Sequence, residues 1–223
     1  MSLAEFKDLC LDATNPEAVG EFWSAVLGLE ARRQDGGDAY LTGTTASQTV
    51  WISGVPEAKT TKNRLHLDVY GTAVESLQDL GASVIDGDSF PWVVMADPEG
   101  GEFCLFIRDE PPPYRLYEIV MDCIDPSAQS KWWVECIGGR RGDDERGFSF
   151  ISNIPNAPFE QMSFVPVSEA KTSKNRVHID VVASDVEALV QAGATLLHPR
   201  DSDIGWSVLA DPEGNEFCVF AAH

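Results

Sequence analysis

The chain contains one stretch twice: EAKTTKNRLHLDV at residues 57–69 and EAKTSKNRVHIDV at residues 169–181, identical at 10 of 13 positions. A second stretch also recurs, as DPEGGEFCLF from Asp97 and DPEGNEFCVF from Asp211, identical at 8 of 10 positions. The two offsets, 112 and 114 residues, nearly agree. A third and looser match relates NPEAVGEFWSAVLG at 15–28 to DPSAQSKWWVECIG at 125–138. Three collinear matches at one period indicate an internally duplicated chain.

Both halves have the same predicted order of elements. A short strand leads into an amphipathic helix that begins after Asn15 or Asp125 and ends before Gly28 or Gly138, which are residue types that favour helix starts and ends. Three short strands follow, and the same order then repeats within the half. We therefore predict an α+β fold by tandem duplication, in which each half holds two βαβββ units forming an eight-strand curved sheet around a pocket.

The boundary between the halves is marked by prolines. The segment DEPPPYR at residues 109–115 contains three of them in a row, and such a run forms a stiff, extended connection. We expect one domain at residues 1–110 and a second at residues 114–223.

Alternation along the strands predicts two different sheet faces, because successive side chains point to opposite sides. One face is aliphatic and suits contact with the helices. The other face carries polar, sulfur-containing and aromatic side chains from both halves: Asp8, Cys10, Asp12, Arg64, His66, Asp68, Cys104, Phe106, Glu118, Arg176, His178, Asp180, Cys218 and Phe220. A curved sheet lining a cavity explains this mixture. The alternative is an open sheet face in contact with solvent.

Composition limits the kinds of partner. The chain has 16 Lys and Arg against 36 Asp and Glu, a formal net charge of −20, which disfavours nucleic acids and anionic membranes. No apolar run is long enough to span a bilayer, and the five cysteines form no CxxC pair. We predict a cytoplasmic protein with reduced thiols and a small-molecule ligand, present as a monomer or homodimer, with no nucleic-acid or membrane partner.

The repeated motifs resemble those of the vicinal oxygen chelate superfamily, which includes glyoxalases, bleomycin-resistance proteins and extradiol dioxygenases. The resemblance rests on NPEAVGEFWSAVLG, KNRLHLDV, DLGASV and DPEGGEFCLF with their second copies. More narrowly, the chain is similar to two-domain glyoxalase-like proteins of bacteria. The resemblance covers nearly the whole chain and implies the βαβββ fold, but the fold alone does not determine an activity.

The resemblance also implies positions for metal ligands. The first-strand ligand falls on Asp8 or Glu118, and the opening strand of the second unit supplies His66 or His178. The closing strand usually carries a glutamate, but Cys104 and Cys218 occupy that position here, and the fourth position offers no ligand. The two expected sets are listed by half: Asp8, His66 and Cys104; Glu118, His178 and Cys218.

These departures from the family pattern leave two interpretations of the donor residues. A carboxylate, an imidazole and a thiolate can bind a divalent ion such as zinc. Alternatively, the carboxylate forms a hydrogen bond with the histidine, and the cysteine packs as a small buried residue. We expect no tightly bound cofactor and keep a divalent metal as an option, in the second half, because Glu118 reaches farther than Asp8.

The remaining candidates are ligand-binding side chains, each with a structural alternative. Asp68 and Asp180 orient the histidines or pair with Arg64 and Arg176. The two arginines draw in an anionic or carbonyl ligand or instead stabilise their loops. Aromatic residues stack on a ligand or pack in the core: Trp92, Phe106, Trp206 and Phe220.

Two functional hypotheses follow. In the first, the protein is a glyoxalase-like, metal-assisted lyase or isomerase acting on a small substrate with vicinal oxygens, and Glu118 or Asp8 moves a proton. In the second, it is a metal-free protein of the bleomycin-resistance type that binds or sequesters a small molecule. The cysteines at the closing strands favour the second hypothesis.

Overall fold

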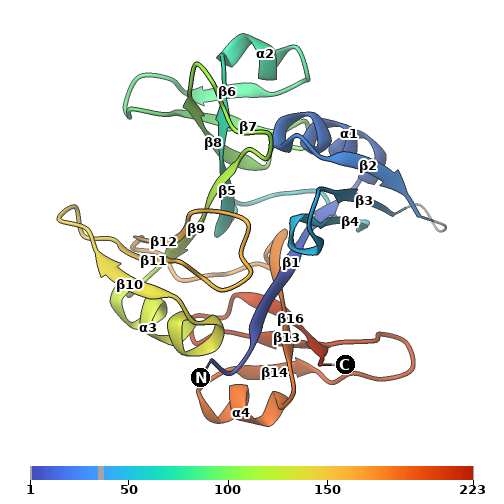
Figure 1. The fold of residues 1–223 in the computed structure, drawn as a ribbon, viewed down its shortest axis with the longest axis vertical. Coiled ribbons are helices and arrows are strands. Elements are labelled where there is room, and N and C mark those ends of the chain that lie inside the picture. The colour runs from blue at the N-terminus through green and yellow to red at the C-terminus, as the bar shows by residue number, and fades with distance from the viewer. Residues whose placement is uncertain (1, 35–37, 223) are drawn as a thin grey trace.

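Four βαβββ units make up the chain in the computed structural model, which describes residues 2–34 and 38–222 (Figure 1). The bounds of the first half are β1 (Glu5–Ala13), α1 (Pro16–Leu27), β2 (Glu30–Arg33), β3 (Ala39–Thr42), β4 (Val50–Gly54), β5 (Leu65–Gly71), α2 (Val74–Gln78), β6 (Ser83–Asp86), β7 (Val93–Ala96) and β8 (Glu102–Ile107). A short 3-10 helix, η1 (Ala46–Gln48), precedes β4.

The second half repeats this order. Its bounds are β9 (Leu116–Cys123), α3 (Pro126–Ile137), β10 (Arg140–Asp143), β11 (Ser149–Ser152), β12 (Gln161–Pro166), β13 (Val177–Ala183), α4 (Val186–Gln191), β14 (Thr195–His198), β15 (Ser207–Ala210) and β16 (Glu216–Ala221). As predicted, α1 begins after the capping side chain of Asn15 and ends at Gly28, in a left-handed conformation, and Asp125 caps α3 in the same way.

The strands form two eight-strand sheets. Sheet A has the order β14-β15-β16-β13-β1-β4-β3-β2, and sheet B the order β10-β11-β12-β9-β5-β8-β7-β6. Sheet A thus joins the first and last units, and sheet B joins the two middle units. The α+β class, the tandem duplication and the eight-strand sheets are confirmed, but the expected pairing of the two units within each half is wrong.

The exchange has a physical explanation. Because the halves repeat, the second unit can pair its first strand with equivalent strands in the first and third units, and the side-chain pattern is the same for both arrangements. The chain between β8 and β9 spans residues 108–115 and joins the second unit to the third, the two units that share sheet B. There β5 pairs antiparallel with β9, and β1 is left to pair antiparallel with β13.

Aromatic side chains of the long helices join the two sheets. Trp23 of α1 packs at 5.4 Å, between ring centroids, on Phe103 of β8, and Trp133 of α3 packs at 5.5 Å on Phe217 of β16. Each contact connects a helix from one sheet's unit with a strand of the other sheet. The two helices lie on opposite sides of the molecule (Figure 1). All four rings are buried, so these contacts contribute strongly to the stability of the assembly.

The repeated DPEG turns anchor the same helices. Asp97 accepts a hydrogen bond from the Trp23 indole at 3.2 Å, and Asp211 accepts one from Trp133 at 3.2 Å. Glu99 then accepts backbone hydrogen bonds at the start of α1, and Glu213 does so at the start of α3. The turn motif is therefore explained by structure, because its two acidic residues fix each helix against the other sheet.

Candidate functional site

The polar face of sheet B gathers donor side chains from both halves of the chain. In the register of the strands, Asp68 on β5 lies opposite Glu118 on β9 and opposite Cys104 on β8. His66 lies two residues before Asp68, on the same face of β5. Asp68, Cys104 and Glu118 are buried, and the His66 side chain is 12% exposed.

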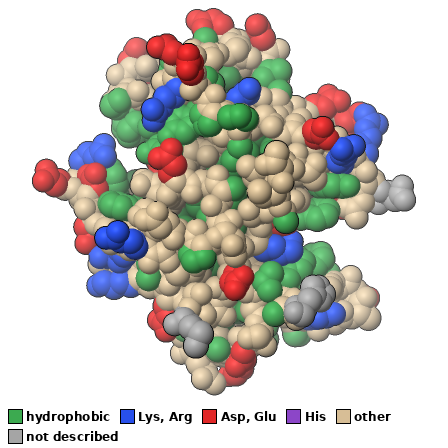
Figure 2. Space-filling view, in the orientation of Figure 1, with side chains coloured by type: hydrophobic (Ala, Val, Ile, Leu, Met, Phe, Trp, Pro, Cys, Tyr) green, Lys and Arg blue, Asp and Glu red, His purple; other side chains and the backbone are tan. Residues whose placement is uncertain are grey.

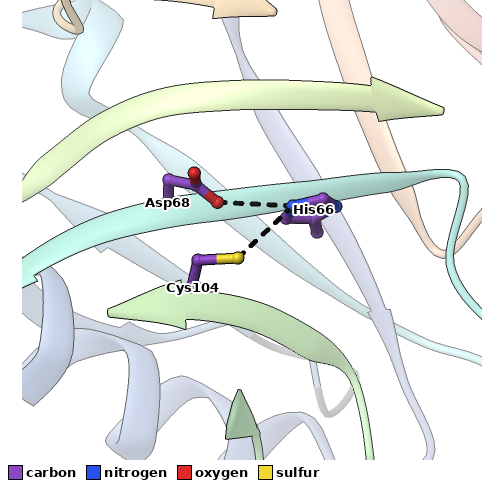
Figure 3. Close-up of side chains that lie close together, drawn as sticks. All are labelled: His66, Asp68 and Cys104. Carbon is purple, nitrogen blue, oxygen red and sulfur yellow. Dashed lines mark hydrogen bonds and ion pairs between the residues drawn. The ribbon is translucent and has the colours of Figure 1, made fainter. Parts of the chain in front are cut away.

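His66 is the centre of a close group (Figure 3). Its Nε2 atom lies 3.3 Å from Asp68 Oδ1 and 3.7 Å from Cys104 Sγ. Donor atoms of these three residues all lie within 4.8 Å of one another. Burial lowers the pKa of His66, but the contact with Asp68 outweighs burial and leaves the pKa above its usual value. The imidazole therefore lies in an environment that favours positive charge.

Glu118 completes the group from the opposite strand. Burial and the charge of Asp68 raise the pKa of Glu118 to about 7, although hydrogen bonds from Ser163 and Gln161 lower it. With its pKa near 7, Glu118 is present in both its charged and its protonated form near neutral pH. Glu118 can consequently accept and return a proton under these conditions.

The donor set of sheet B suits a divalent ion. Buried Asp68 Oδ1 and His66 Nδ1 have no hydrogen-bond partner, and Asp8 Oδ1 and Asp180 Oδ1 of sheet A share this property. Asp68 Oδ1 is nevertheless close to the imidazole. Unsatisfied buried polar atoms are rare and often mark a missing ion or water. An imidazole, a carboxylate and a thiolate are ligands that zinc accepts. Burial and Asp68 raise the pKa of the Cys104 thiol, so binding an ion there requires loss of its proton.

Sheet A carries the equivalent residues with different contacts. Asp8 on β1 lies opposite Asp180 on β13, which lies opposite Cys218 on β16. Burial and the charge of Asp8 raise the pKa of Asp180. Here, however, the Lys7 ammonium lies 2.6 Å from Asp8 Oδ2, and Trp51 donates its indole N–H to the same oxygen at 3.1 Å. The Lys7 ammonium therefore lies next to the carboxyl pair of Asp8 and Asp180.

The histidine of sheet A also has another partner. His178 Nε2 lies 3.2 Å from Asp12 Oδ2, and the same oxygen accepts from Lys174 Nζ at 2.6 Å. His178 is thus held by Asp12, away from a shared position with Asp180 and Cys218. Among the described residues, the only group of three or more donors close enough to share an ion is His66, Asp68 and Cys104.

Two halves of the sequence match a known domain. The family model of the glyoxalase-like domain matches residues 8–106 and again residues 118–220. The chain belongs to the glyoxalase-like domain family. With it, the chain falls in the vicinal oxygen chelate superfamily, as the repeated motifs indicate. No protein with a curated description matches the sequence.

Solved structures share the glyoxalase-like fold at low sequence identity. Glyoxalase I from Zea mays superposes with a TM-score of 0.70 at 13% identity, over 97% of this chain and 92% of that chain. A putative dioxygenase from Bacillus subtilis gives a TM-score of 0.63 at 14% identity, over 99% of this chain and 86% of that chain. At these identities the likeness establishes the fold alone. Among the described helices, none has the length and hydrophobicity needed to cross a bilayer.

The exchange of units regroups the glyoxalase-like ligand positions. Each predicted set took all its residues from one half of the chain, and this grouping is wrong. Sheet B brings Glu118 to His66 and Cys104, whereas sheet A brings Asp8 to Asp180 and Cys218 and leaves His178 bound to Asp12. The group that suits an ion therefore consists of first-half residues, His66, Asp68 and Cys104. An ion was expected among second-half residues instead.

The predicted ligand-binding residues divide into two groups. Aromatic side chains lie beside the donor groups: Trp92 stacks on Phe106 at 5.3 Å, and Trp206 stacks on Phe220 at 5.4 Å, between ring centroids. All four rings are partly exposed. The arginines instead bind loop carbonyls, Arg64 that of Glu169 and Arg176 that of Glu57, which favours the structural alternative for them.

Sequence reasoning missed the residues that make the two sheets different. Lys7 and Tyr117 occupy equivalent positions, and so do Trp51 and Ser163. An alignment of the two repeats would have revealed these substitutions next to the candidate ligands. It could not have shown their partners, because the pairing of β1 with β13 and of β9 with β5 was not predicted.

Proposed function

We propose that the protein is a metal-assisted enzyme of the glyoxalase type, a lyase or isomerase for a small molecule with vicinal oxygens, and that its active site lies on sheet B. One observation carries the proposal: His66, Asp68 and Cys104 place an imidazole, a carboxylate and a thiol within 4.8 Å of one another. Glu118, whose pKa is raised to about 7, lies directly beside them.

His66, Asp68 and Cys104 would hold the ion. A bound divalent ion supplies positive charge that stabilises negative charge developing on the oxygens of a substrate. Glu118 moves the proton, since both its charged and its neutral forms are present near neutral pH. Ser163 and Gln161 hold the Glu118 carboxyl group in place through hydrogen bonds to Oε2.

Aromatic side chains suit the carbon skeleton of a small substrate. The Tyr117 ring lies 5.0 Å from Phe106 and 4.8 Å from Tyr70, and the stack continues from Phe106 to Trp92. Tyr117 directly precedes Glu118 on β9. This arrangement supports an apolar wall beside the proton-transfer group, where a ligand would be oriented by ring contacts.

The metal-free alternative has its own support. The pKa of Glu118 is raised, and so is that of the neighbouring His66 imidazole. Both groups therefore favour their protonated forms, which lowers the negative charge of the site without an ion. Because burial also keeps the Cys104 thiol protonated, the same residues could bind a ligand through hydrogen bonds alone.

Measuring the bound metal distinguishes the enzyme proposal from the metal-free alternative. Chelator-treated protein is titrated with zinc by calorimetry, and the bound metal is then measured by elemental analysis. We expect one ion per chain in the wild type, lost in His66→Ala and Cys104→Ala. The matched variants His178→Ala and Cys218→Ala change the equivalent residues of sheet A and should retain the bound ion. Absence of binding in the wild type, or equal loss in both pairs, would contradict the enzyme proposal and favour the metal-free binder.

A further inference from the structure

A cavity lies between the two copies of the EAKTxKNR loop. Its volume is about 670 Å³, and its walls are residues 57–64 and 169–176 with Asp12, Asp122 and Val167. The loops come from opposite halves of the chain, so the cavity lies where the two repeats meet.

Reciprocal hydrogen bonds hold the loops together. The Arg64 guanidinium donates to the carbonyl of Glu169, and Arg176 donates to the carbonyl of Glu57 at 2.8 Å. The hydroxyl groups of Thr61 and Ser173 lie 2.7 Å apart, from one loop to the other. These bonds fix both walls, so the cavity is preformed and a ligand need not order the loops on binding.

The walls are rich in cations although the protein is acidic. Six of the chain's 16 Lys and Arg residues line the cavity, against four of its 36 Asp and Glu residues. The cations are Lys59, Lys62, Arg64, Lys171, Lys174 and Arg176, and the carboxylates are Asp12, Glu57, Asp122 and Glu169. Figure 2, by contrast, shows acidic and basic side chains dispersed over the visible face of the molecule.

Two of these cations keep free donors. Lys59 and Lys171 are largely buried in ion pairs with Glu102 and Glu216. Lys62 and Lys174 each bind one buried aspartate, Asp122 and Asp12 respectively. Their side chains nevertheless remain 61% and 54% exposed. Since an ammonium has three donors, each lysine can bind a further anionic group.

We propose that this cavity binds a small, multiply charged oxyanion, of the phosphate or dicarboxylate class, between Lys62 and Lys174. The equivalent positions of the two lysines in the repeated loops suit a ligand with acidic oxygens on both sides. Thr60 and Thr172 also line the cavity and carry hydroxyl donors. Charge-assisted hydrogen bonds of this kind are stronger than neutral ones. The proposal is independent of a metal on sheet B.

The cavity is connected to the polar face of sheet A. Asp12 accepts hydrogen bonds from both Lys174 and His178 on the same oxygen. An anion bound to the free donors of Lys174 places negative charge close to Asp12 and to the His178 ring that Asp12 holds. Binding in the cavity is therefore expected to change the surroundings of His178, which lies outside the cavity walls.

The test uses the full chain. Calorimetric titrations with inorganic phosphate and with malonate, at constant ionic strength, should show saturable binding with one site per chain. We expect Lys62→Gln/Lys174→Gln to weaken it at least about tenfold. Lys131→Gln, which removes an exposed lysine on α3, should leave it unchanged. Binding of one probe but not the other identifies the class, and either result supports the proposal.

Magnetic resonance gives the second measurement. The His178 ring signals should move on saturation, while those of exposed His198 should not. Lys62→Arg/Lys174→Arg keeps both charges and should retain binding, which preserves the test if the glutamine variant fails to fold. No saturable binding of either probe, or equal weakening in Lys131→Gln, would overturn the proposal.

Discussion

Sheets A and B are built from equivalent units, yet their polar faces differ in how the central carboxyl pair is balanced. In sheet B, Asp68 and Glu118 lie beside His66 and Cys104, which offer donor atoms close enough to share an ion. In sheet A, Lys7 supplies a covalently attached cation to Asp8 and Asp180. One duplicated scaffold has thus kept the acidic pair at both sites while varying the group that neutralises it.

The largest expected difference between the sheets is catalytic. If sheet B holds the active site, Glu118→Gln should lower kcat/KM by about 10²–10⁴-fold, because a general base is lost without a change in size. The equivalent change in sheet A, Asp8→Asn, should leave the rate intact. Steady-state kinetics on a vicinal-oxygen compound that the wild type converts provide the measurement. A comparable loss in Asp8→Asn would mean that both sheets take part in the reaction.

The second prediction transfers the lysine of sheet A to sheet B. Tyr117 occupies the position of Lys7, so Tyr117→Lys places an ammonium beside Glu118 and should weaken zinc binding at least about tenfold through like-charge repulsion. Tyr117→Phe keeps the ring without the charge and should bind zinc as the wild type does. Calorimetry on chelator-treated protein compares the two variants.

The reciprocal variant, Lys7→Tyr, sharpens this comparison. It frees Asp8 from its cation, but His178 remains bound to Asp12, so sheet A should still hold no ion. Acquisition of a second zinc by Lys7→Tyr would show that the lysine alone accounts for the difference between the sheets.

The third prediction concerns pH in metal-free protein. The folded state binds the Glu118 proton more tightly than the unfolded chain, because the pKa is raised from 4.5 to about 7. The free energy of unfolding should therefore fall as pH rises through this window. Glu118→Gln should remove roughly 1–3 kcal/mol of that decline, as measured by urea unfolding between pH 4.5 and 7.5.

Sheet A provides the control for this pH dependence. Burial and Asp8 raise the pKa of Asp180 as well, so its ionisation acts in the same direction. Asp180→Asn should remove a separate part of the decline and leave the Glu118 contribution in place. If Glu118→Gln leaves the pH dependence of the wild type unchanged, the pKa of Glu118 is not raised in the folded protein.

Much of the fold could be predicted from the sequence, because its signals are local. The caps Asn15 and Asp125, the DPEG turns and strand alternation each act over a few residues. The pairing of the units could not be predicted, since repeated first strands offer the same pattern to either neighbour. The site followed the same rule: His66, Cys104 and Glu118 were recognised as candidates, but only the register of β5 against β9 brings them together.

The smallest expected effect compares the two DPEG turns. Glu99 and Glu213 each accept hydrogen bonds from two backbone N–H groups at the start of a long helix. Glu99 also accepts from Arg176 at 3.2 Å, an ion pair with side chains only 13% and 17% exposed. Gln at either position keeps an acceptor oxygen but loses the charge. We expect Glu213→Gln to lower the free energy of unfolding by about 1 kcal/mol and Glu99→Gln by slightly more.

Urea unfolding at pH 7 measures both, and a double variant with Arg176→Gln isolates the ion pair. If Glu99→Gln and Glu213→Gln are equally destabilising, Arg176 contributes nothing there, and the two turns are energetically equivalent despite the different surroundings of their sheets.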